Sequence, residues 1–482
     1  DGKKLIFTGR VKTETGTYSI TFPSDLAPKK ITASTGVLKG WLKGPERILW
    51  LVSGVPAAQP ISGSAKTYPF SAYQELSKSA RYQAGFETAW RIMRDAWYDD
   101  NFGNHNWDHV RRKYLKAAES ASDPSAFAKV LSLMLGELNG SHLGFYPASD
   151  LNPTLDGGDE WRPTTAHLGV RFDPKFSGPG LKVRDVIPDG PATESGSAIS
   201  PGEVILSIDG VSVDPKIDLT TVLNGRSNRD ISLKVLSKGK ESDERNVVLR
   251  PISYSLARSS LYKKWQDDNR AIVAQRANNI GYLHIQGMNW NSFLDFEREL
   301  YDVGYGKDGL IIDVRDNGGG STTDHLLTAL TQPDHAITVP RGGGQGYPQS
   351  RKVYATWTKP IVVLCNQNSY SNAEIFSHAI KNLKRGKLIG VPTAGGVIST
   401  GTARVMDVGT VRLPFRGWFV KSTGEDMELN GAIPHVTVWP RPTEIPRGID
   451  RQLTKAVKVL RQEIKAWKSQ KTPELRKARS EE

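Results

Sequence analysis

Residues 361–377 read IVVLCNQNSYSNAEIFS. The short apolar run at the start is typical of a strand buried in a sheet, and a helix is expected to begin near Asn372. A serine in the loop between them is exposed and lies near the free N–H groups and positive end of the helix. This segment alone leaves two roles open for Ser371, which could be a nucleophile or a residue that caps the helix.

The surrounding residues 257–446 show the pattern of an α/β domain. Short apolar runs, expected to be buried strands, alternate with longer stretches of helical periodicity. The strand candidates are GYLHI (281–285), GLIIDV (309–314), PIVVLC (360–365) and KLIGV (387–391). The helix candidates include NSFLDFERELYDV (291–303) and NAEIFSHAIKNL (372–383).

A glycine run follows one of these strands, in LIIDVRDNGGGS (310–321). Consecutive glycines at 318–320 allow backbone amides to approach a ligand without interference from side chains. A flexible loop is the alternative interpretation. A phosphate-binding loop is excluded because no Gly-Lys-Ser/Thr sequence follows.

Residues 79–160 are predicted to be mainly helical. FETAWRIMRDAWYDD (86–100) places apolar residues three and four positions apart, and a later helix ends at Asn139-Gly140. The helix break leaves Ser141 and His142 on a tight turn. Neither His142 nor Glu428, which precedes a glycine turn in EDMELNGAIPHV (425–436), has a role assigned by its own segment.

Residues 161–256 resemble a circularly permuted PDZ domain of the kind found in proteases. Several typical phrases occur in order, namely HLGVRF (167–172), GLKVRDVIPDGPA (180–192) and GEVILSIDGVSV (202–213). The resemblance implies that Leu168, Gly169 and Val170 form the loop that binds a peptide carboxylate.

The two ends of the chain differ in character. Residues 1–78 contain short apolar runs separated by turns, and the opening DGKKLIFTG resembles a strand of a β-propeller, so this part is expected to be the end of a propeller. Residues 447–482 are predicted to form an amphipathic helix and a charged tail. Much of the net charge of +13 lies there, and without an aromatic and basic groove elsewhere we expect no nucleic-acid partner.

Composition and sequence pattern limit the class of protein to which the chain can belong. No apolar run reaches the ~20 residues that a membrane-spanning helix needs, and the chain does not open with a signal peptide. We therefore expect a protein without a membrane partner and with a cytoplasmic location. An extracytoplasmic location is the alternative, since a chain without disulfides fits either compartment. The single cysteine, Cys365, is predicted to be a buried, inert thiol, and no sequence pattern indicates a metal or another cofactor.

The order and spacing of these segments resemble the C-terminal half of tricorn-type proteases, within the C-terminal-processing peptidase group. The resemblance covers residues 80–465 and implies a multidomain α+β fold: a β-propeller remnant, a helical core domain, a PDZ domain and a crotonase-like α/β core domain. The family's Ser-His pair falls on Ser141 and His142, its nucleophile on Ser371 and its glutamate on Glu428. These four residues would form a Ser-His-Ser-Glu tetrad.

The resemblance also implies an oxyanion hole. One backbone donor falls within Gly318–Gly320, where Gly319 is favoured, and the other is the N–H of Asn372. Tricorn proteins usually carry Asp after the nucleophile, and Asn372 departs from that pattern. A backbone donor is unaffected by the difference.

A related branch of the group uses a Ser-Lys pair. Its lysine would fall on Gly396 in PTAGGV (392–397), and no lysine occurs between Lys387 and Lys421. The sequence therefore predicts a serine endopeptidase that acts on peptides or unfolded segments, without a cofactor, and the resemblance suggests a homo-oligomer. The alternative is a catalytically idle scaffold whose PDZ domain binds peptides.

Overall fold

The computed structural model describes residues 3–42, 46–61, 63–72, 75–148, 164–238, 243–333, 335–339, 341–342, 355–471 and 474–476. The chain divides into two compact units, Asp1–Ser77 and Lys78–Glu482. The expected boundary between the helical and PDZ domains, at 160–161, lies outside the described residues, as does the end of the C-terminal tail.

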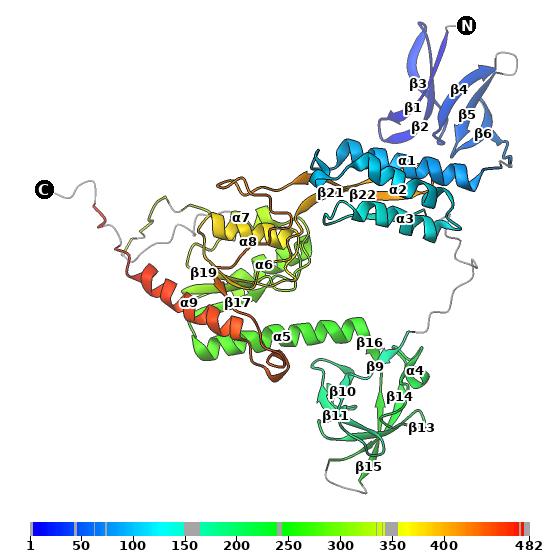
Figure 1. The fold of residues 1–482 in the computed structure, drawn as a ribbon. Coiled ribbons are helices and arrows are strands. Elements are labelled where there is room, and N and C mark those ends of the chain that lie inside the picture. The colour runs from blue at the N-terminus through cyan, green and yellow to red at the C-terminus, as the bar shows by residue number, and fades with distance from the viewer. Residues whose placement is uncertain are drawn as a thin grey trace. The chain divides into compact units, whose positions relative to one another are not determined.

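The first unit contains two antiparallel sheets (Figure 1). One sheet has the order β1-β2-β3 and the other β4-β5-β6-β7. The strands are β1 (Lys4–Val11), β2 (Glu14–Thr21), β3 (Asp25–Thr32), β4 (Val37–Leu42), β5 (Arg47–Val52), β6 (Val55–Pro60) and β7 (Lys66–Thr67). The predicted all-β character is present, and the assignment to a propeller stays a prediction.

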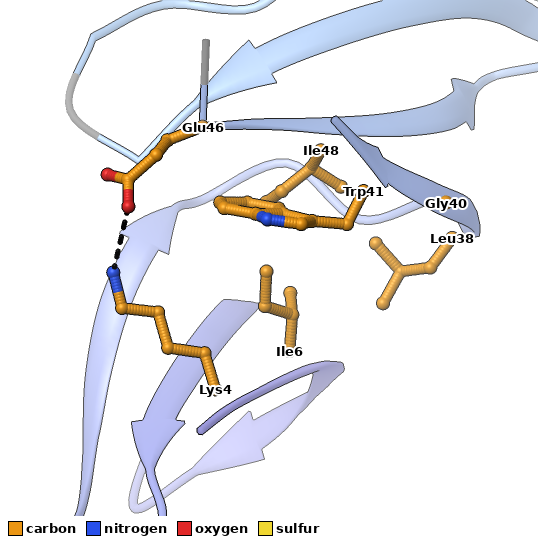
Figure 2. Close-up of a pocket in the computed structure, with 7 residues that line it drawn as sticks. All are labelled: Lys4, Ile6, Leu38, Gly40, Trp41, Glu46 and Ile48. Atoms are coloured by element: carbon orange, nitrogen blue, oxygen red, sulfur yellow. Dashed lines mark ion pairs between the residues drawn. The ribbon is translucent and has the colours of Figure 1, made fainter. Parts of the chain in front are cut away.

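A cavity of about 400 Å³ lies in this unit, between residues of β1 and residues of β4 and β5 (Figure 2). Ile6, Trp41 and Ile48 supply its apolar lining. An ion pair of 3.7 Å between Lys4 Nζ and Glu46 Oε1 lies at its edge. Because both side chains of the pair are substantially exposed, the pair contributes little to stability.

In the second unit, three helices and a three-stranded sheet share one apolar core. The helices are α1 (Lys78–Ala96), α2 (Trp107–Glu119) and α3 (Pro124–Gly136), and the strands are β8 (Gly144–Pro147), β21 (Ile398–Val405) and β22 (Gly409–Gly417). The sheet order is β21-β22-β8. Phe86 and Leu131 of the helices pack in one cluster with Val405 and Val411 of the distant hairpin. Residues 398–417 therefore complete the helical domain, which their position in the sequence did not indicate.

Residues 166–253 form the antiparallel sheet of the predicted PDZ domain, in the order β10-β11-β12-β14-β15, with β13 paired to β12. Two further strands, β9 and β16, pair with each other. The elements are β9 (Ala166–His167), β10 (Val170–Phe172), β11 (Leu181–Val186), β12 (Val204–Ile208), β13 (Val211–Ser212), α4 (Thr220–Leu223), β14 (Ile231–Leu236), β15 (Glu244–Leu249) and β16 (Ile252–Ser253).

A parallel sheet with the order β17-β18-β19-β20-β23 forms the centre of the α/β domain (Figure 1). Its strands are β17 (Ile280–His284), β18 (Gly309–Asp313), β19 (Ile361–Cys365), β20 (Lys387–Gly390) and β23 (Val436–Thr437). One face packs against α6 (Trp290–Asp302), α7 (Thr323–Leu330) and α8 (Asn372–Asn382), and the other against α5 (Tyr254–Arg276) and α9 (Arg451–Lys468). Because both faces are covered, β17, β18 and β19 are buried at every position. The predicted apolar runs are present, with His284 and Asp313 as the polar residues at the ends of β17 and β18.

Candidate active site

Ser371 lies between the end of β19 and the start of α8, the junction that the sequence predicted. Its backbone angles are φ 56° and ψ −118°, in a region that non-glycine residues rarely adopt. Such strain is typical of a nucleophile on a sharp strand-to-helix turn. The backbone N–H of Ser371 donates a hydrogen bond of 3.0 Å to Glu374 Oε1, which fixes the turn.

The predicted glycine run lies against this serine. A Cβ atom on Gly319 would come within 2.7 Å of Ser371 Cβ and 3.1 Å of the Asn372 nitrogen, so a larger residue would displace the turn. Gly320 is equally constrained by Met288 O, whereas a Cβ on Gly318 would meet nothing within 4 Å. The close approach expected of glycines therefore occurs at the second and third positions.

Asn317 holds the glycine loop in place and engages the favoured oxyanion donor. Its side-chain Nδ2 donates to Ile285 O at 2.8 Å, and its backbone carbonyl accepts a bond of 2.9 Å from the Tyr370 N–H. The Gly319 N–H donates to Asn317 Oδ1 at 2.9 Å. An oxyanion at Gly319 would have to compete with that carboxamide oxygen, and the choice among Gly318, Gly319 and Gly320 stays a prediction.

The Asn372 side chain belongs to the framework of the site. Its side-chain Oδ1 accepts a bond of 2.9 Å from the Thr323 N–H. The backbone carbonyl of Asn372 accepts a second bond, of 2.7 Å, from Thr323 Oγ1. These bonds join the start of α8 to the start of α7. An aspartate would accept the same bonds, so Asn in place of the family's Asp preserves this connection.

The structure brings Ser141, His142 and Glu428 together. Ser141 Oγ lies 2.6 Å from His142 Nδ1 and donates to Glu428 Oε2 at 2.9 Å. The Ser141 N–H donates to Glu428 Oε1 at 2.6 Å, and the Val397 N–H donates to Glu428 Oε2 at 2.7 Å. Glu428 is 4% exposed, so it is a buried carboxylate and not a solvated surface residue.

Both titratable groups of this cluster are shifted by burial. Burial, followed by the charge of Arg412, lowers the pKa of His142 to about 4. The imidazole is therefore neutral at physiological pH, as a general base must be. Burial raises the pKa of Glu428 above its ordinary value, although three hydrogen bonds from Ser141 and Val397 oppose the shift.

Glu374 is a residue of the site that the sequence interpretation missed. It is fully buried and accepts bonds from Thr393 Oγ1 at 2.6 Å and from the Gly396 N–H at 2.8 Å, in addition to the bond from Ser371. It therefore ties the serine turn to residues 393–396. The pattern Ser371-x-x-Glu374 is a capping box, and that signal could have identified it.

The predicted carboxylate-binding loop of the PDZ domain is engaged in internal contacts. The Gly169 N–H donates to His167 Nδ1 at 2.9 Å, and Gly169 O accepts a bond of 2.8 Å from the Ile187 N–H. Leu168 and Val170 are buried in the domain core. Binding of a peptide by these residues stays a prediction.

Two chemical expectations concern the described part of the chain. Cys365 is fully buried and burial raises the pKa of its thiol, which confirms the expected inert cysteine. Among the described residues there is no cluster of three or more His, Cys, Asp or Glu side chains that could hold a metal ion.

Comparison with known proteins assigns families to three segments. Residues 79–136 match the tricorn protease C1 domain, residues 185–254 match the tricorn protease PDZ domain, and residues 279–438 match peptidase family S41. The segment that carries Ser371 is thus similar to peptidase family S41. The predicted resemblance to the C-terminal half of tricorn proteases is therefore confirmed.

Individual relatives agree with this assignment. Tricorn protease homolog 1 of Streptomyces coelicolor is 27% identical over 400 residues, which cover 80% of this chain and 35% of the relative. Tricorn protease of Thermoplasma acidophilum is 27% identical over 399 residues, which cover 79% of this chain and 35% of the relative. The carboxyl-terminal-processing protease of Synechocystis is 28% identical over 319 residues, which cover 64% of this chain and 69% of the relative.

A solved structure supports the fold. The crystal structure of the tricorn protease aligns with a TM-score of 0.68 and 21% sequence identity, covering 96% of this chain and 46% of that chain. The mixed α/β multidomain fold with a PDZ domain is therefore confirmed. The chain spans about a third of the length of the tricorn relatives it matches.

Proposed function

We propose that the chain is a serine endopeptidase that hydrolyses peptide bonds in peptides or unfolded segments through an acyl-enzyme. Ser371 is the nucleophile and His142 its general base, and Ser141 and Glu428 orient the histidine. The observation that carries this proposal is the hydrogen-bonded chain from Glu428 through Ser141 to His142, since it joins residues 287 positions apart. The match of residues 279–438 to peptidase family S41 supports the same assignment.

The direction of proton transfer follows from the hydrogen bonds. Ser141 Oγ donates its proton to Glu428, so its oxygen can accept a hydrogen bond from the Nδ1–H of His142. This bond favours the tautomer that carries its proton on Nδ1 and leaves the lone pair of Nε2 free to accept a proton from Ser371 Oγ. His142 then gives that proton to the amine that leaves, and a water molecule repeats the cycle to release the acyl group.

Charge stabilisation occurs at both ends of the proton path. Glu428 stabilises the imidazolium through the Ser141 hydroxyl, while the backbone amides of Asn372 and Gly319 stabilise the oxyanion. Loss of one oxyanion donor in other hydrolases costs roughly 3–4 kcal/mol of transition-state stabilisation. Gly319 lies against the Ser371 turn, and its N–H would exchange its bond to Asn317 Oδ1 for one to the oxyanion.

Peptides or unfolded protein segments are the proposed substrates, and self-association into a homo-oligomer is the proposed assembly. No nucleic acid, membrane or cofactor is proposed to take part, and the proposed location is the cytoplasm. Within the residues described, no helix is long and apolar enough to cross a membrane.

A peptide-binding scaffold without catalysis is the second candidate. The PDZ segment is the observation that favours it. Strain at Ser371 argues for an enzyme instead, because an idle core has no use for a nucleophile held in an unfavourable backbone conformation.

Peptide hydrolysis by two serine variants tests the proposal. Ser371→Ala should abolish turnover and leave thermal stability almost unchanged. Ser369→Ala is the control: this fully buried hydroxyl donates to Val314 O at 2.7 Å, so its loss should lower stability by about 1–3 kcal/mol and leave turnover in the folded fraction. Undiminished turnover by Ser371→Ala would overturn the assignment.

A further inference from the structure

We propose that Tyr370 is a positioning residue that holds the His142 ring in its working orientation, and that Gly396 is glycine in order to leave room for the tyrosine. This inference rests on the proposed function of His142 as the base. It adds a fifth side chain to the set formed by Ser371, His142, Ser141 and Glu428.

The rings of Tyr370 and His142 lie against each other. Their centroids are 4.8 Å apart and their planes are inclined by 21°, which is a stacked arrangement. Tyr370 Oη lies 3.2 Å from His142 Nδ1. The ring and the hydroxyl of Tyr370 therefore both contact the same imidazole.

The tyrosine is held firmly enough to position its neighbour. Its N–H donates to Asn317 O at 2.9 Å, and its carbonyl accepts a bond of 3.1 Å from the Ala373 N–H. These bonds attach Tyr370 to the glycine loop on one side and to the first turn of α8 on the other. It is also the residue directly before the strained Ser371, so one short segment positions both the nucleophile and the base.

His142 needs such support because its own backbone is unfavourable. Its φ of 61° places it in the left-handed region, on the turn between α3 and β8. The Ser141 hydroxyl contacts only one edge of the ring, at Nδ1. A stacked aromatic ring restricts rotation of the imidazole out of its plane, which a single hydrogen bond cannot do.

Gly396 lies directly against the Tyr370 ring. A Cβ atom at this position would lie 2.3 Å from Tyr370 Cε2 and 3.1 Å from Ser141 Cβ. The Gly396 N–H is fixed by Glu374 Oε1 at 2.8 Å, so the backbone cannot simply withdraw. Any side chain at residue 396 would therefore displace the Tyr370 ring.

The contact between Gly396 and the Tyr370 ring explains why this chain cannot carry the lysine of the Ser-Lys branch. The position that would carry the lysine in that branch is Gly396, and here the Tyr370 ring fills the space in front of it. A tyrosine stacked on a histidine base and a lysine base at residue 396 are mutually exclusive. The pair Tyr370 and Gly396 is the local signature of a histidine-based site in this chain.

The hydroxyl of Tyr370 has a separate effect from its ring. With the proton on His142 Nδ1, the oxygens of Ser141 and Tyr370 both face that N–H. Both then favour the tautomer that leaves Nε2 unprotonated. Removing the hydroxyl alone should be less damaging than removing the whole ring.

Kinetics of Tyr370→Phe and Tyr370→Ala test these two contributions. Tyr370→Phe keeps the stacked ring and should lose about 3- to 10-fold in kcat by the typical value of one neutral hydrogen bond. Tyr370→Ala should lose about 10²-fold in kcat, the usual cost of a small misplacement of a reacting group, with little change in KM. Tyr305→Ala, at a tyrosine that is 90% exposed, is the control and should match the wild type.

A double-mutant cycle tests the role of Gly396. Gly396→Ala should lower kcat by a factor comparable to that of Tyr370→Ala when the tyrosine is present. In the Tyr370→Ala background it should cost little more, because the ring it displaces is already gone. Independent, multiplying losses would overturn the inference, as would wild-type kcat in Tyr370→Ala.

Nuclear magnetic resonance of the His142 ring nitrogens separates this inference from the proposed function, since it needs no turnover. The wild type should show the Nδ1–H tautomer with a single ordered ring, and Tyr370→Ala should show averaging of the two tautomers. An unchanged His142 spectrum in Tyr370→Ala would contradict positioning. If the wild type hydrolyses no peptide yet the spectra change as expected, the proposed function fails and the positioning role stands.

Discussion

Glu428 shows how one side chain can serve both structure and chemistry. Its Oε1 accepts the Ser141 N–H, and its Oε2 accepts both Ser141 Oγ and the Val397 N–H. All three partners are donors, so the site is built for an ionised carboxylate. A neutral amide can satisfy only one side of this arrangement.

Glu428→Gln should therefore lower kcat by roughly 10²–10³-fold, since the charge that stabilises the imidazolium is lost. KM should change little because the carboxylate faces Ser141 rather than the substrate. The variant should also lose about 1–3 kcal/mol of stability, as its amide nitrogen leaves a buried donor unpaired.

Glu425→Gln is the matched control for this experiment, because Glu425 is exposed three residues earlier. Kinetic constants and urea unfolding should be measured for both variants. Equal and small effects would show that Glu428 has no special role.

His142 should give the enzyme an unusual pH profile. A histidine in water has a pKa near 6.5, but burial and then the charge of Arg412 lower that of His142 to about 4. The base is active when neutral, so kcat/KM should stay level from pH 7 to about pH 5 and fall by half near pH 4.

Replacement of Arg412 identifies the histidine in that profile. Arg412→Gln removes a positive charge near the imidazole, which raises the pKa of His142 and should move the acid limb to higher pH. Arg416→Gln, four residues further along β22, is the control and should leave the limb in place. A wild-type acid limb at pH 6.5, or one that Arg412→Gln does not move, would contradict this explanation.

At the scale of elements, a buried ionic network anchors the glycine loop to α9. Arg315 pairs with Asp313 at 2.6 Å and with Asp450 at 2.8 Å, and Tyr282 Oη donates to Asp313 at 2.9 Å. Burial would raise the pKa of Asp313, but the guanidinium of Arg315 overrides that effect and holds it below the ordinary value. Asp313 is the last residue of β18, and Arg315 lies between that strand and Gly318–Gly320.

Arg315→Met should consequently destabilise the protein by about 3–5 kcal/mol, because Asp313 would be left buried without its counter-charge. Urea unfolding monitored by circular dichroism measures this loss. Arg298→Met removes an exposed ion pair with Asp295 and should cost less than about 1 kcal/mol. Similar losses from the two variants would mean that the network does not support the fold.

Much of this element layout was predictable from sequence. The central strands β17, β18 and β19 are mainly apolar and buried at every position because helices cover both sheet faces, and α8 begins at Asn372 as expected. The amphipathic C-terminal helix is confirmed as α9, although Trp467 at its end is 37% exposed rather than packed with the apolar side.

Other features could not be predicted, because they depend on contacts distant in sequence. The β21–β22 hairpin packs with α1 and α3, and no local signal in residues 398–417 indicates that choice. The contact of Ser141 with Glu428 could be anticipated only through the family resemblance. Tyr370 and Gly396 carry no motif of their own, and their relation appears only in space, where a Cβ atom on Gly396 would lie 2.3 Å from Tyr370 Cε2.

At the scale of the whole molecule, all the side chains assigned to the chemistry lie in the second compact unit, Lys78–Glu482. That unit combines the proposed base, from the segment after α3, with the proposed nucleophile at the start of α8. Catalysis therefore requires the helical and α/β parts to be folded together. Within the described part of the C-terminal segment, no basic residue contributes a group to the site.

Covalent labelling with a fluorophosphonate, followed by peptide mapping, examines the nucleophile and its base together. A single adduct on Ser371 is expected, formed at a rate that falls by at least about 10²-fold in His142→Ala, since an unassisted serine hydroxyl is a poor nucleophile. Circular dichroism of each variant should confirm that it is folded. Absence of an adduct on the folded wild type, or an adduct on a serine other than Ser371, would contradict the assignment of this chain as a serine peptidase with Ser371 as nucleophile.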